Sequence, residues 1–255
     1  MTVGFIETDD FIEQTLSQPL QIVYRDENYV AVFKPAGLIV HRCNATLPHE
    51  PVLLQRLRNQ LHCQVYPVHR LDRPTAGLIL FGLSGKAAAK MVDLFTNRLV
   101  SKYYQALVCG HTPDSGRIDT PLETIEQQDY EQASHVDRPT QPALTEYERL
   151  ARFQIPPESP TSEPVRLSLL EIKPMTGRSH QIRRHLKTVG HPVIGDHRHG
   201  DMSYNQRVSS MTGVVRMLLT SMRLDFRHPY SRELQSIVVS RGSEFDLAIS
   251  KINQP

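Results

Sequence analysis

A cluster of charged side chains between residues 69 and 77 is the part of the sequence best suited to chemistry. The stretch His69–Gly77 (HRLDRPTAG) places one carboxylate, Asp72, between Arg70 and Arg73. Neighbouring positive charges favour the ionised form of a carboxylate, and an ionised carboxylate can act as a nucleophile or a base. A surface turn with solvated ion pairs explains the same residues, because structural ion pairs also perturb carboxylates. Either a reactive carboxylate or a charged turn is therefore expected here.

A second charged region lies between Lys173 and Gly200, where basic residues greatly outnumber acidic ones. Its net charge is +5, so the rest of a chain with net charge +2 sums to −3. An uneven charge of this kind is the electrostatic footprint of a protein that contacts phosphate groups. An ordinary solvated helix face is less consistent with the region, because five histidines are interleaved and balancing glutamates are missing. The charged positions are Lys173, Arg178, Arg183, Arg184, Lys187 and Arg198, with Asp196 as the single acid.

The end of this basic region also contains residue types that bind transition metals. They are His191, Asp196, His197, His199 and Asp201. No cysteine and no His-x-x-x-His pair accompanies them, whereas prolines and glycines surround them. We therefore expect a loop and no metal, and a metal-dependent hydrolase is the weaker alternative.

Three sequence blocks, in this order along the chain, resemble the RluA family of RNA pseudouridine synthases. The first is His69–Gly77, with the pattern His-Arg-Leu-Asp-Arg-x-Thr-x-Gly; the others are Lys102-Tyr103-Tyr104 and Thr176–His185. The block Lys34–Gly37 (KPAG) also fits, and the similarity runs from about residue 22 to residue 239. Ala76 stands where family members usually carry serine, and we expect this change to remove a local turn hydrogen bond without abolishing activity.

The resemblance implies that the protein isomerises a uridine in RNA to pseudouridine without a cofactor. Asp72 would be the catalytic carboxylate, and Arg183 would hold it ionised through a bidentate contact. Tyr104 would stack on the uracil and assist proton transfer. Whether Asp72 attacks the sugar, attacks the base or abstracts a proton stays open. Without the motif, Tyr104 would be interpreted as an ordinary core tyrosine on a strand.

The resemblance also predicts RNA contacts around these residues. A base inside structured RNA must be flipped out of its stack, and Arg70 matches the family residue that fills the vacated place. Ile182 would pack under the flipped base, although an apolar helix residue is more often part of the core. Contacts with phosphates supply affinity without reading sequence. The other predicted RNA contacts are Arg73, Lys102, Arg178, His180, Arg184, Lys187 and Arg198.

Further segments resemble a branch of the family that acts on tRNA, at a uridine at position 65. These are Gln141–Ala143, Arg183–Leu186, His191–Asp196 and His199–Asp201. Other family members modify ribosomal RNA or other tRNA positions, so these targets remain alternatives. An RNA-binding or RNA-folding protein without catalysis is an alternative of a different class, but binding alone does not require Asp72, Tyr104 and Arg183 together.

The composition is that of a globular protein, and we expect the protein to be cytoplasmic. Of 255 residues, 39% are hydrophobic and 22% charged. No run approaches the roughly 20 apolar residues that a membrane helix needs. Residues 1–10 include acidic residues but no basic one, unlike an export signal. Cys43, Cys63 and Cys109 show no spacing typical of disulfides or zinc sites. No obvious apolar patch is visible, so a monomer is expected.

The elements that must position the charged residues follow an α+β pattern. Apolar runs predict a hairpin over 21–24 and 29–33 and further strands over 78–81, 102–108, 143–153, 165–172, 214–226 and 234–239. Helical spacing of apolar residues predicts helices over 52–62, 84–97, 178–189 and 245–252. Hairpins with few helices favour a mixed, largely antiparallel central sheet with flanking helices. The resemblance adds the pseudouridine synthase fold and its catalytic cleft.

No linker forces a division into domains. Residues 1–20 are expected to form an arm, too short for a separate RNA-binding module, and residues 21–255 the catalytic domain. We expect residues 118–142 to form an excursion over the surface and residues 156–164 to form a mobile loop. In the helix over 178–189, Ile182, Leu186 and Val189 are expected to be buried, which places Arg183 beside the core edge.

Overall fold

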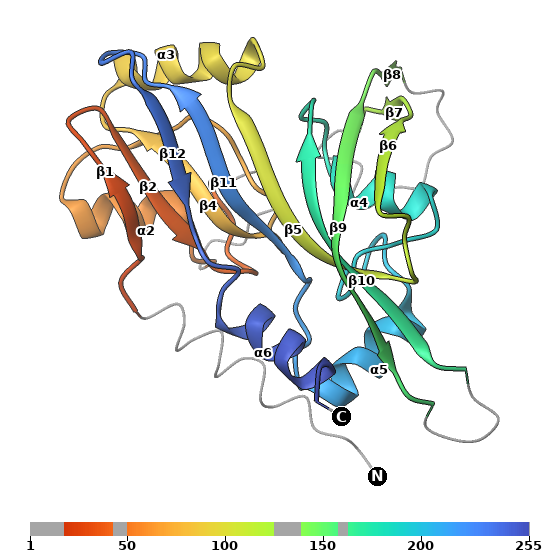
Figure 1. The fold of residues 1–255 in the computed structure, drawn as a ribbon. Coiled ribbons are helices and arrows are strands. Elements are labelled where there is room, and N and C mark those ends of the chain that lie inside the picture. The colour runs from red at the N-terminus through yellow and green to blue at the C-terminus, as the bar shows by residue number, and fades with distance from the viewer. Residues whose placement is uncertain (1–17, 43–49, 125–138, 158–162, 255) are drawn as a thin grey trace.

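The computed structural model describes residues 18–42, 50–124, 139–157 and 163–254, and Figure 1 shows their arrangement. The strands are β1 (Ile22–Arg25), β2 (Tyr29–Lys34), β3 (Tyr66–Pro67), β4 (Ala76–Gly82), β5 (Ser101–Cys109), β6 (Ser115–Asp119), β7 (Leu122–Glu123), β8 (Thr140–Gln141), β9 (Leu144–Ile155), β10 (Val165–Pro174), β11 (Leu219–Arg227) and β12 (Leu234–Val238). The helices are α2 (Leu53–Leu61), α3 (Gly85–Thr96), α4 (Gln181–Thr188), α5 (Met202–Thr212) and α6 (Ser243–Ile252).

Ten of these strands form one mixed sheet that is largely antiparallel. Along it the strands run in the order β1, β2, β4, β11, β5, β10, β9, β6, with β12 paired to β11 and β3 paired to β4. A short parallel pairing between β4 and β11 joins Ala76 and Gly77 to Thr220 and Ser221. The predicted α+β class with a mixed, largely antiparallel sheet is therefore confirmed.

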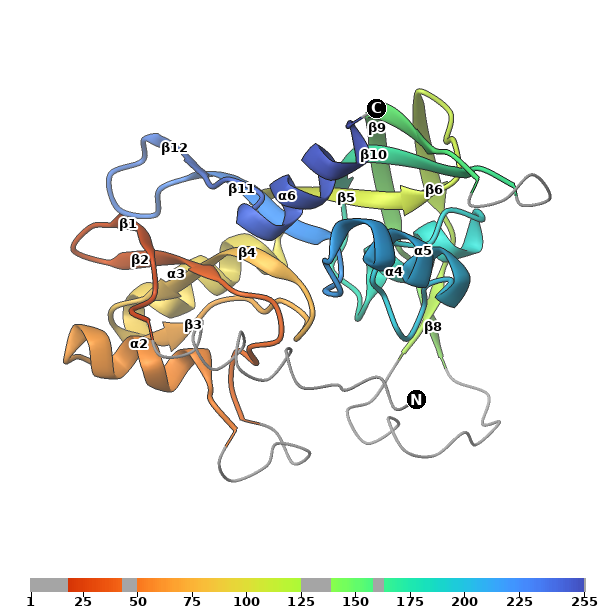
Figure 2. The same ribbon diagram turned by 90° about the horizontal axis from the view of Figure 1, so that it is seen from below.

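The sheet has two halves, and each half carries its own helices. Figures 1 and 2 show α2 and α3 beside β1, β2 and β4, whereas α4 and α5 lie beside β9 and β10. The strands β11 and β5 run between the halves. Side chains from the two halves can therefore meet where β4, β11 and β5 come together.

The central strand β4 is buried on both faces, which explains its unbroken apolar sequence AGLILFG. All seven of its residues are buried. Leu80 belongs to the same core cluster as Met91 of α3, whereas Phe81 belongs to the cluster that contains Leu57 of α2. A strand that is covered on both faces lacks the alternation of polar and apolar residues seen at a half-exposed strand. The loop before β4 is thus anchored to a rigid element.

Most of the predicted elements are present, and the exceptions have physical reasons. The late strand predicted from residue 214 begins at Leu219. The helix α5 was not predicted, since its sequence MSYNQRVSSMT has no continuous apolar stripe. Asp201 caps α5 by accepting the N–H of Tyr204, and Gly213 ends it in the left-handed conformation. The prediction that Val189 is buried is wrong: it lies beyond the last residue of α4 and is 41% exposed.

Some expectations concern residues outside the described ranges. The arm over 1–20 and the loop over 156–164 fall largely there, as do residues 125–138 of the predicted surface excursion. The described parts of that excursion contain β6, β7 and β8. Among the described residues, none of the helices has the length and apolar character needed to cross a membrane.

Candidate active site

The loop that carries Asp72 connects β3 to β4 and is held by a buried lysine. Lys34, at the end of β2, is fully buried, and its Nζ donates to the carbonyl oxygens of Leu38 (2.7 Å) and Arg73 (3.0 Å). The N–H of Gly37 also donates to the carbonyl of Arg73 at 2.9 Å. Within the loop, the N–H of Thr75 closes a turn by donating to the carbonyl of Asp72 at 3.0 Å. The KPAG block and the signature block therefore form one fixed structure.

Gly77 allows the end of this loop to pass close to β11. Its φ is +108°, and a Cβ built there would lie 2.2 Å from the carbonyl oxygen of Ser221. Any other residue would both strain the backbone and collide with the neighbouring strand. The glycine of the signature thus sets the approach of β4 to β11.

Arg183 on α4 is the partner of Asp72, although the two residues are far apart in the sequence. Its Nη1 donates to Oδ2 of Asp72 at 3.1 Å, and the side chain of Asp72 is 21% exposed, so the carboxylate is accessible from the cleft. The predicted pairing of these two residues is present, but the predicted bidentate contact is wrong. Within the described residues, neither Arg70 nor Arg73 forms an ion pair with Asp72, and Arg73 instead pairs with Glu50 at 2.6 Å.

The bidentate partner of Arg183 is Asp196. The Nε and Nη2 atoms of Arg183 donate to Oδ2 and Oδ1 of Asp196 at 2.7 and 2.9 Å. Asp196 is 1% exposed and also accepts the backbone N–H groups of Arg198 and His199. Burial alone would raise the pKa of Asp196, but these hydrogen bonds and the charge of Arg183 lower it to about 2. Asp196 therefore stays ionised and fixes the guanidinium that reaches Asp72.

Sequence reasoning treated Asp196 as a possible metal ligand and missed this role. The available signal was its position as the one acid in a basic region, where a buried cation needs a partner. Among the described residues, no group of three histidine, cysteine, aspartate or glutamate side chains could hold a metal ion.

A pair of histidines, His180 and His199, extends from Asp72. The Nδ1 of His180 is 2.9 Å from Nε2 of His199, and the Nε2 of His180 is 3.9 Å from Oδ2 of Asp72. Burial lowers the pKa of His180 and of His199 to about 4, so both rings are neutral at pH 7. When His199 carries its proton on Nε2, it donates that proton to Nδ1 of His180, and His180 then carries its own proton on Nε2. This Nε2–H faces the carboxylate of Asp72, so this pair of tautomers is the favourable one.

Tyr104 on β5 lies in the wall of the cleft and is also part of the hydrophobic core. Its side chain is buried, and both burial and the nearby charge of Asp72 raise its pKa above the usual value. The phenol therefore stays protonated, and it can donate a proton or a hydrogen bond but cannot serve as a base at neutral pH. The core interpretation and the stacking interpretation of this residue are compatible.

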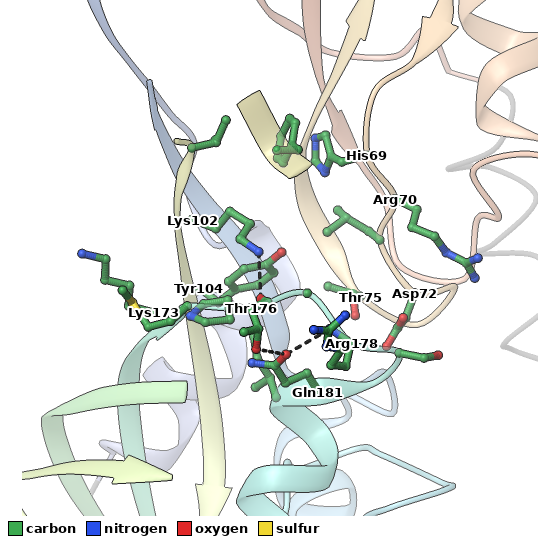
Figure 3. A pocket seen from close by; sticks show the side chains of 18 of the residues that line it. His69, Arg70, Asp72, Thr75, Lys102, Tyr104, Lys173, Thr176, Arg178 and Gln181 are labelled. Carbon is green, nitrogen blue, oxygen red and sulfur yellow. Dashed lines mark hydrogen bonds between the residues drawn. The ribbon is translucent and has the colours of Figure 1, made fainter. Parts of the chain in front are cut away.

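Asp72, Tyr104, His180 and Arg183 line one cleft of about 900 Å³ between the two halves of the sheet (Figure 3). In Figure 3, Asp72 and Arg70 come from the loop before β4, and Tyr104 and Lys102 come from β5. Among the described residues of the lining, the cationic side chains outnumber the single carboxylate, that of Asp72. They are Arg70, Arg98, Lys102, Lys173, Arg178 and Arg183. A cleft of this charge suits a polyanion.

The structure separates the predicted RNA contacts into two groups. Those that line the cleft are Arg70, Lys102, Arg178, His180 and Ile182. Arg178 also donates its Nε to the carbonyl of Pro142 at 3.1 Å. Those outside the lining are Arg73, Arg184, Lys187 and Arg198. Arg184, for example, donates to the carbonyl of Glu123 at 2.9 Å, so it reaches β7 and not the cleft.

Comparisons with known proteins indicate the family of this chain. A family model described as RNA pseudouridylate synthase matches residues 28–188. The tRNA pseudouridine synthase C of Pasteurella multocida is 40% identical over 223 residues, which cover 88% of this chain and 91% of that protein. The tRNA pseudouridine synthase C of Vibrio cholerae is 37% identical over 223 residues, with the same coverage of 88% and 91%.

Solved structures show the same relationship. Human RNA Pseudouridylate Synthase Domain Containing 1 has a TM-score of 0.66 and 26% identity, covering 94% of this chain and 86% of that one. Human RNA Pseudouridylate Synthase Domain Containing 4 has a TM-score of 0.67 at 24% identity, covering 95% and 96%, and so shares the fold. With the family model and the relatives in agreement, the chain belongs to the RNA pseudouridylate synthase family.

Proposed function

We propose that this protein isomerises a uridine of tRNA, at position 65, to pseudouridine. The target is supported by the relatives named tRNA pseudouridine synthase C, which are 36–40% identical to this chain. The strongest support for the chemistry is that Asp72, Tyr104 and Arg183, from three separate sequence blocks, meet in one cationic cleft. A protein that only binds RNA has no need of a carboxylate at that place.

The reaction breaks the bond from C1′ of the ribose to N1 of the uracil and forms a bond from C1′ to C5. The base turns between the two steps, the proton leaves C5, and N1 ends protonated, so no external reagent is consumed. Asp72 is the carboxylate that acts on the nucleoside, and Arg183 holds it in position. The neutral phenol of Tyr104 stacks on the base and takes part in proton transfer.

Access to the base requires flipping, which costs a few kcal/mol of stacking and pairing energy. Arg70 is exposed and lies at the lining of the cleft beside Asp72, where it can fill the place that the base leaves. Ile182 lines the same cleft from α4, at 7% exposure, and offers an apolar surface to the flipped ring.

Residues 21–255 act as the catalytic domain, and the enzyme works as a cytoplasmic monomer.

The test is to map pseudouridine chemically in tRNA and rRNA from cells with and without the gene, followed by rescue with purified protein. The expected result is one tRNA site, at position 65, that disappears in the deletion strain and returns with the protein. Loss of an rRNA site would instead identify ribosomal RNA as the substrate. Unchanged pseudouridine in both RNAs, together with measurable RNA binding, would favour the non-catalytic alternative.

A further inference from the structure

The cleft continues beyond Asp72 to the place where α3 ends and β5 begins. Its lining there includes His69, Phe95, Arg98 and Lys102, which together we call the outer pocket. In Figure 3, His69 lies well above Asp72, and Lys102 lies to the left of both. Pockets for drug-sized ligands occupy about 300–1,000 Å³. The cleft is near the top of that range, so it has room for more than a flipped base.

Arg98 occupies a backbone position where glycine is favoured. The N–H of Arg98 donates to the carbonyl of Phe95, and the N–H of Leu99 donates to the carbonyl of Leu94, which is the Schellman ending of a helix. The φ of Arg98 is +59°, in the left-handed region that strains any residue with a Cβ. A conformation of this kind costs free energy in any residue other than glycine, so the surrounding structure must hold it.

Within the part of the chain that the structure describes, the guanidinium of Arg98 has no partner to account for its presence. Arg98 is exposed and lines the cleft. Among the described residues, none forms a hydrogen bond or an ion pair with its side chain. The charge is therefore available to a ligand inside the cleft.

Lys102 places a second positive charge beside the first. Its Nζ donates to the carbonyl of Thr176 at 3.0 Å, and burial together with the nearby charge of Arg98 lowers its pKa to about 8. Of the four residues that define the outer pocket, none carries a carboxylate to offset the two cations. Two like charges held together in this way are unfavourable until an anion binds between them.

An aromatic pair forms the wall beside these cations. The rings of His69 and Phe95 are stacked, with centroids 4.6 Å apart and planes 21° apart. The Nε2 of His69 accepts the backbone N–H of Leu80 at 3.0 Å, and burial lowers its pKa to about 3, so the ring is neutral and fixed. A flat apolar wall next to two cations has the chemistry to receive a nucleotide, with its sugar or base on the rings and its phosphate on the charges.

We propose that the outer pocket binds a backbone phosphate of the RNA next to the flipped uridine, through Arg98 and Lys102. This inference rests on the proposed function and extends it from the reacting base to the strand that carries it. The contact with Arg98 supplies affinity and fixes how far the target nucleotide enters the cleft.

The test measures tRNA affinity over a series of salt concentrations for the wild type, Arg98→Gln and Arg98→Lys. Removing one bound phosphate lowers the slope of log K against log salt by about 1. Arg98→Gln is expected to show that fall and about tenfold weaker binding, as for the removal of one charged hydrogen bond. Arg98→Lys keeps the charge and should keep the slope. Arg232→Gln is the matched control, because Arg232 is also exposed, has φ +64° and lies outside the cleft lining.

Arg98→Gly separates a binding role from a structural one. Glycine relieves the left-handed strain, so the Tm should rise by about 2 °C while tRNA binding weakens as in Arg98→Gln. A lower Tm in Arg98→Gly would overturn the proposal of a phosphate site. Wild-type tRNA affinity and salt slope in both Arg98→Gln and Arg98→Gly would also overturn it.

The two proposals fail in distinguishable ways. If the wild type forms no pseudouridine but the slope is lower in Arg98→Gln, the phosphate site stands and the proposed function is wrong. If the wild type is active on tRNA and the slopes of the variants match it, the phosphate site is wrong.

Discussion

Arg183 touches two carboxylates, and the difference between its two contacts explains how the site is built. The bidentate contact with buried Asp196 fixes the plane of the guanidinium, and the remaining Nη1 reaches the accessible Asp72. Burial alone would lower the pKa of Arg183, but the two carboxylates raise it, so the cation is permanent. Asp196 is a positioning residue: it acts on the reaction through Arg183.

The substitution Asp196→Asn should therefore reduce both stability and turnover. Breaking a buried ion pair by neutralising one partner costs about 3–5 kcal/mol of unfolding free energy. We expect kcat to fall more than tenfold, because Arg183 loses its anchor, while the Kd for tRNA changes little. Urea unfolding and single-turnover assays measure the two effects. Asp201→Asn is the control, since asparagine caps a helix as well as aspartate does and Asp201 caps α5. Equal behaviour of the two variants would contradict the role of Asp196.

Acid titration tests the same ion pair in the unmodified protein. The pKa of Asp196 is lowered from 3.8 to about 2 in the fold, so its stabilising contribution is complete above pH 4. That contribution disappears as the pH falls from about 4 to about 2, and it amounts to roughly 2 kcal/mol. The unfolding free energy of Asp196→Asn should change less with pH over this range than that of the wild type. If the unfolding free energies of the wild type and Asp196→Asn changed with pH in parallel, Asp196 would make no such contribution.

At the scale of the elements, the short contact between β4 and β11 decides where the catalytic loop ends. Gly77→Ala should destabilise the protein by at least about 2 kcal/mol, because a Cβ would collide with the backbone of Ser221 at a positive φ. Gly85→Ala is the control: a Cβ at Gly85 meets nothing within 4 Å and improves the start of α3. Thermal unfolding compares the two. An unchanged Tm for Gly77→Ala would show that β11 yields to the side chain.

Elements with strong local patterns could be predicted from the sequence. The apolar run of β4 and the stripe and Ser84 cap of α3 specify these elements from nearby residues alone. The family blocks added Asp72, Tyr104 and Arg183, and the structure brings these three together. Pattern and motif were sufficient to predict an element or a site residue wherever one segment carries the information.

The remaining features depend on how separate segments pack. The polar helix α5 is specified by its cap at Asp201 and its ending at Gly213 more than by an apolar stripe, so periodicity could not reveal it. The choice of Asp196 as the bidentate partner of Arg183 follows from the fold of the loop after α4. Spacing along the chain contains no information about such distances.

At the scale of the whole molecule, the positive charge of the cleft comes from both halves of the sheet. Arg98 follows α3 in one half and Lys173 lies on β10 in the other, while Lys102 begins the connecting strand β5. The net charge of the chain is only +2, so composition alone conceals this concentration. Assembly of the sheet creates the surface that attracts the RNA.

This arrangement predicts that tRNA affinity falls as the pH rises above about 8. The pKa of Lys102 is lowered to about 8, so its charge is present below that pH and is lost above it. Fluorescence anisotropy with labelled tRNA across this pH range measures the change. The variant Lys102→Arg keeps its charge and should show a flatter pH dependence. The same fall in Lys102→Arg would assign the pH dependence to another group.

The most direct test compares wild type and Asp72→Asn on the same tRNA. Asparagine preserves the size of the side chain and the loop around it, but it removes the anionic oxygen that Arg183 holds at the cleft. We expect no pseudouridine above background in the variant, with a Kd for tRNA within about threefold of the wild type. Pseudouridine formation at a near-normal rate by Asp72→Asn would show that Asp72 is not the catalytic carboxylate.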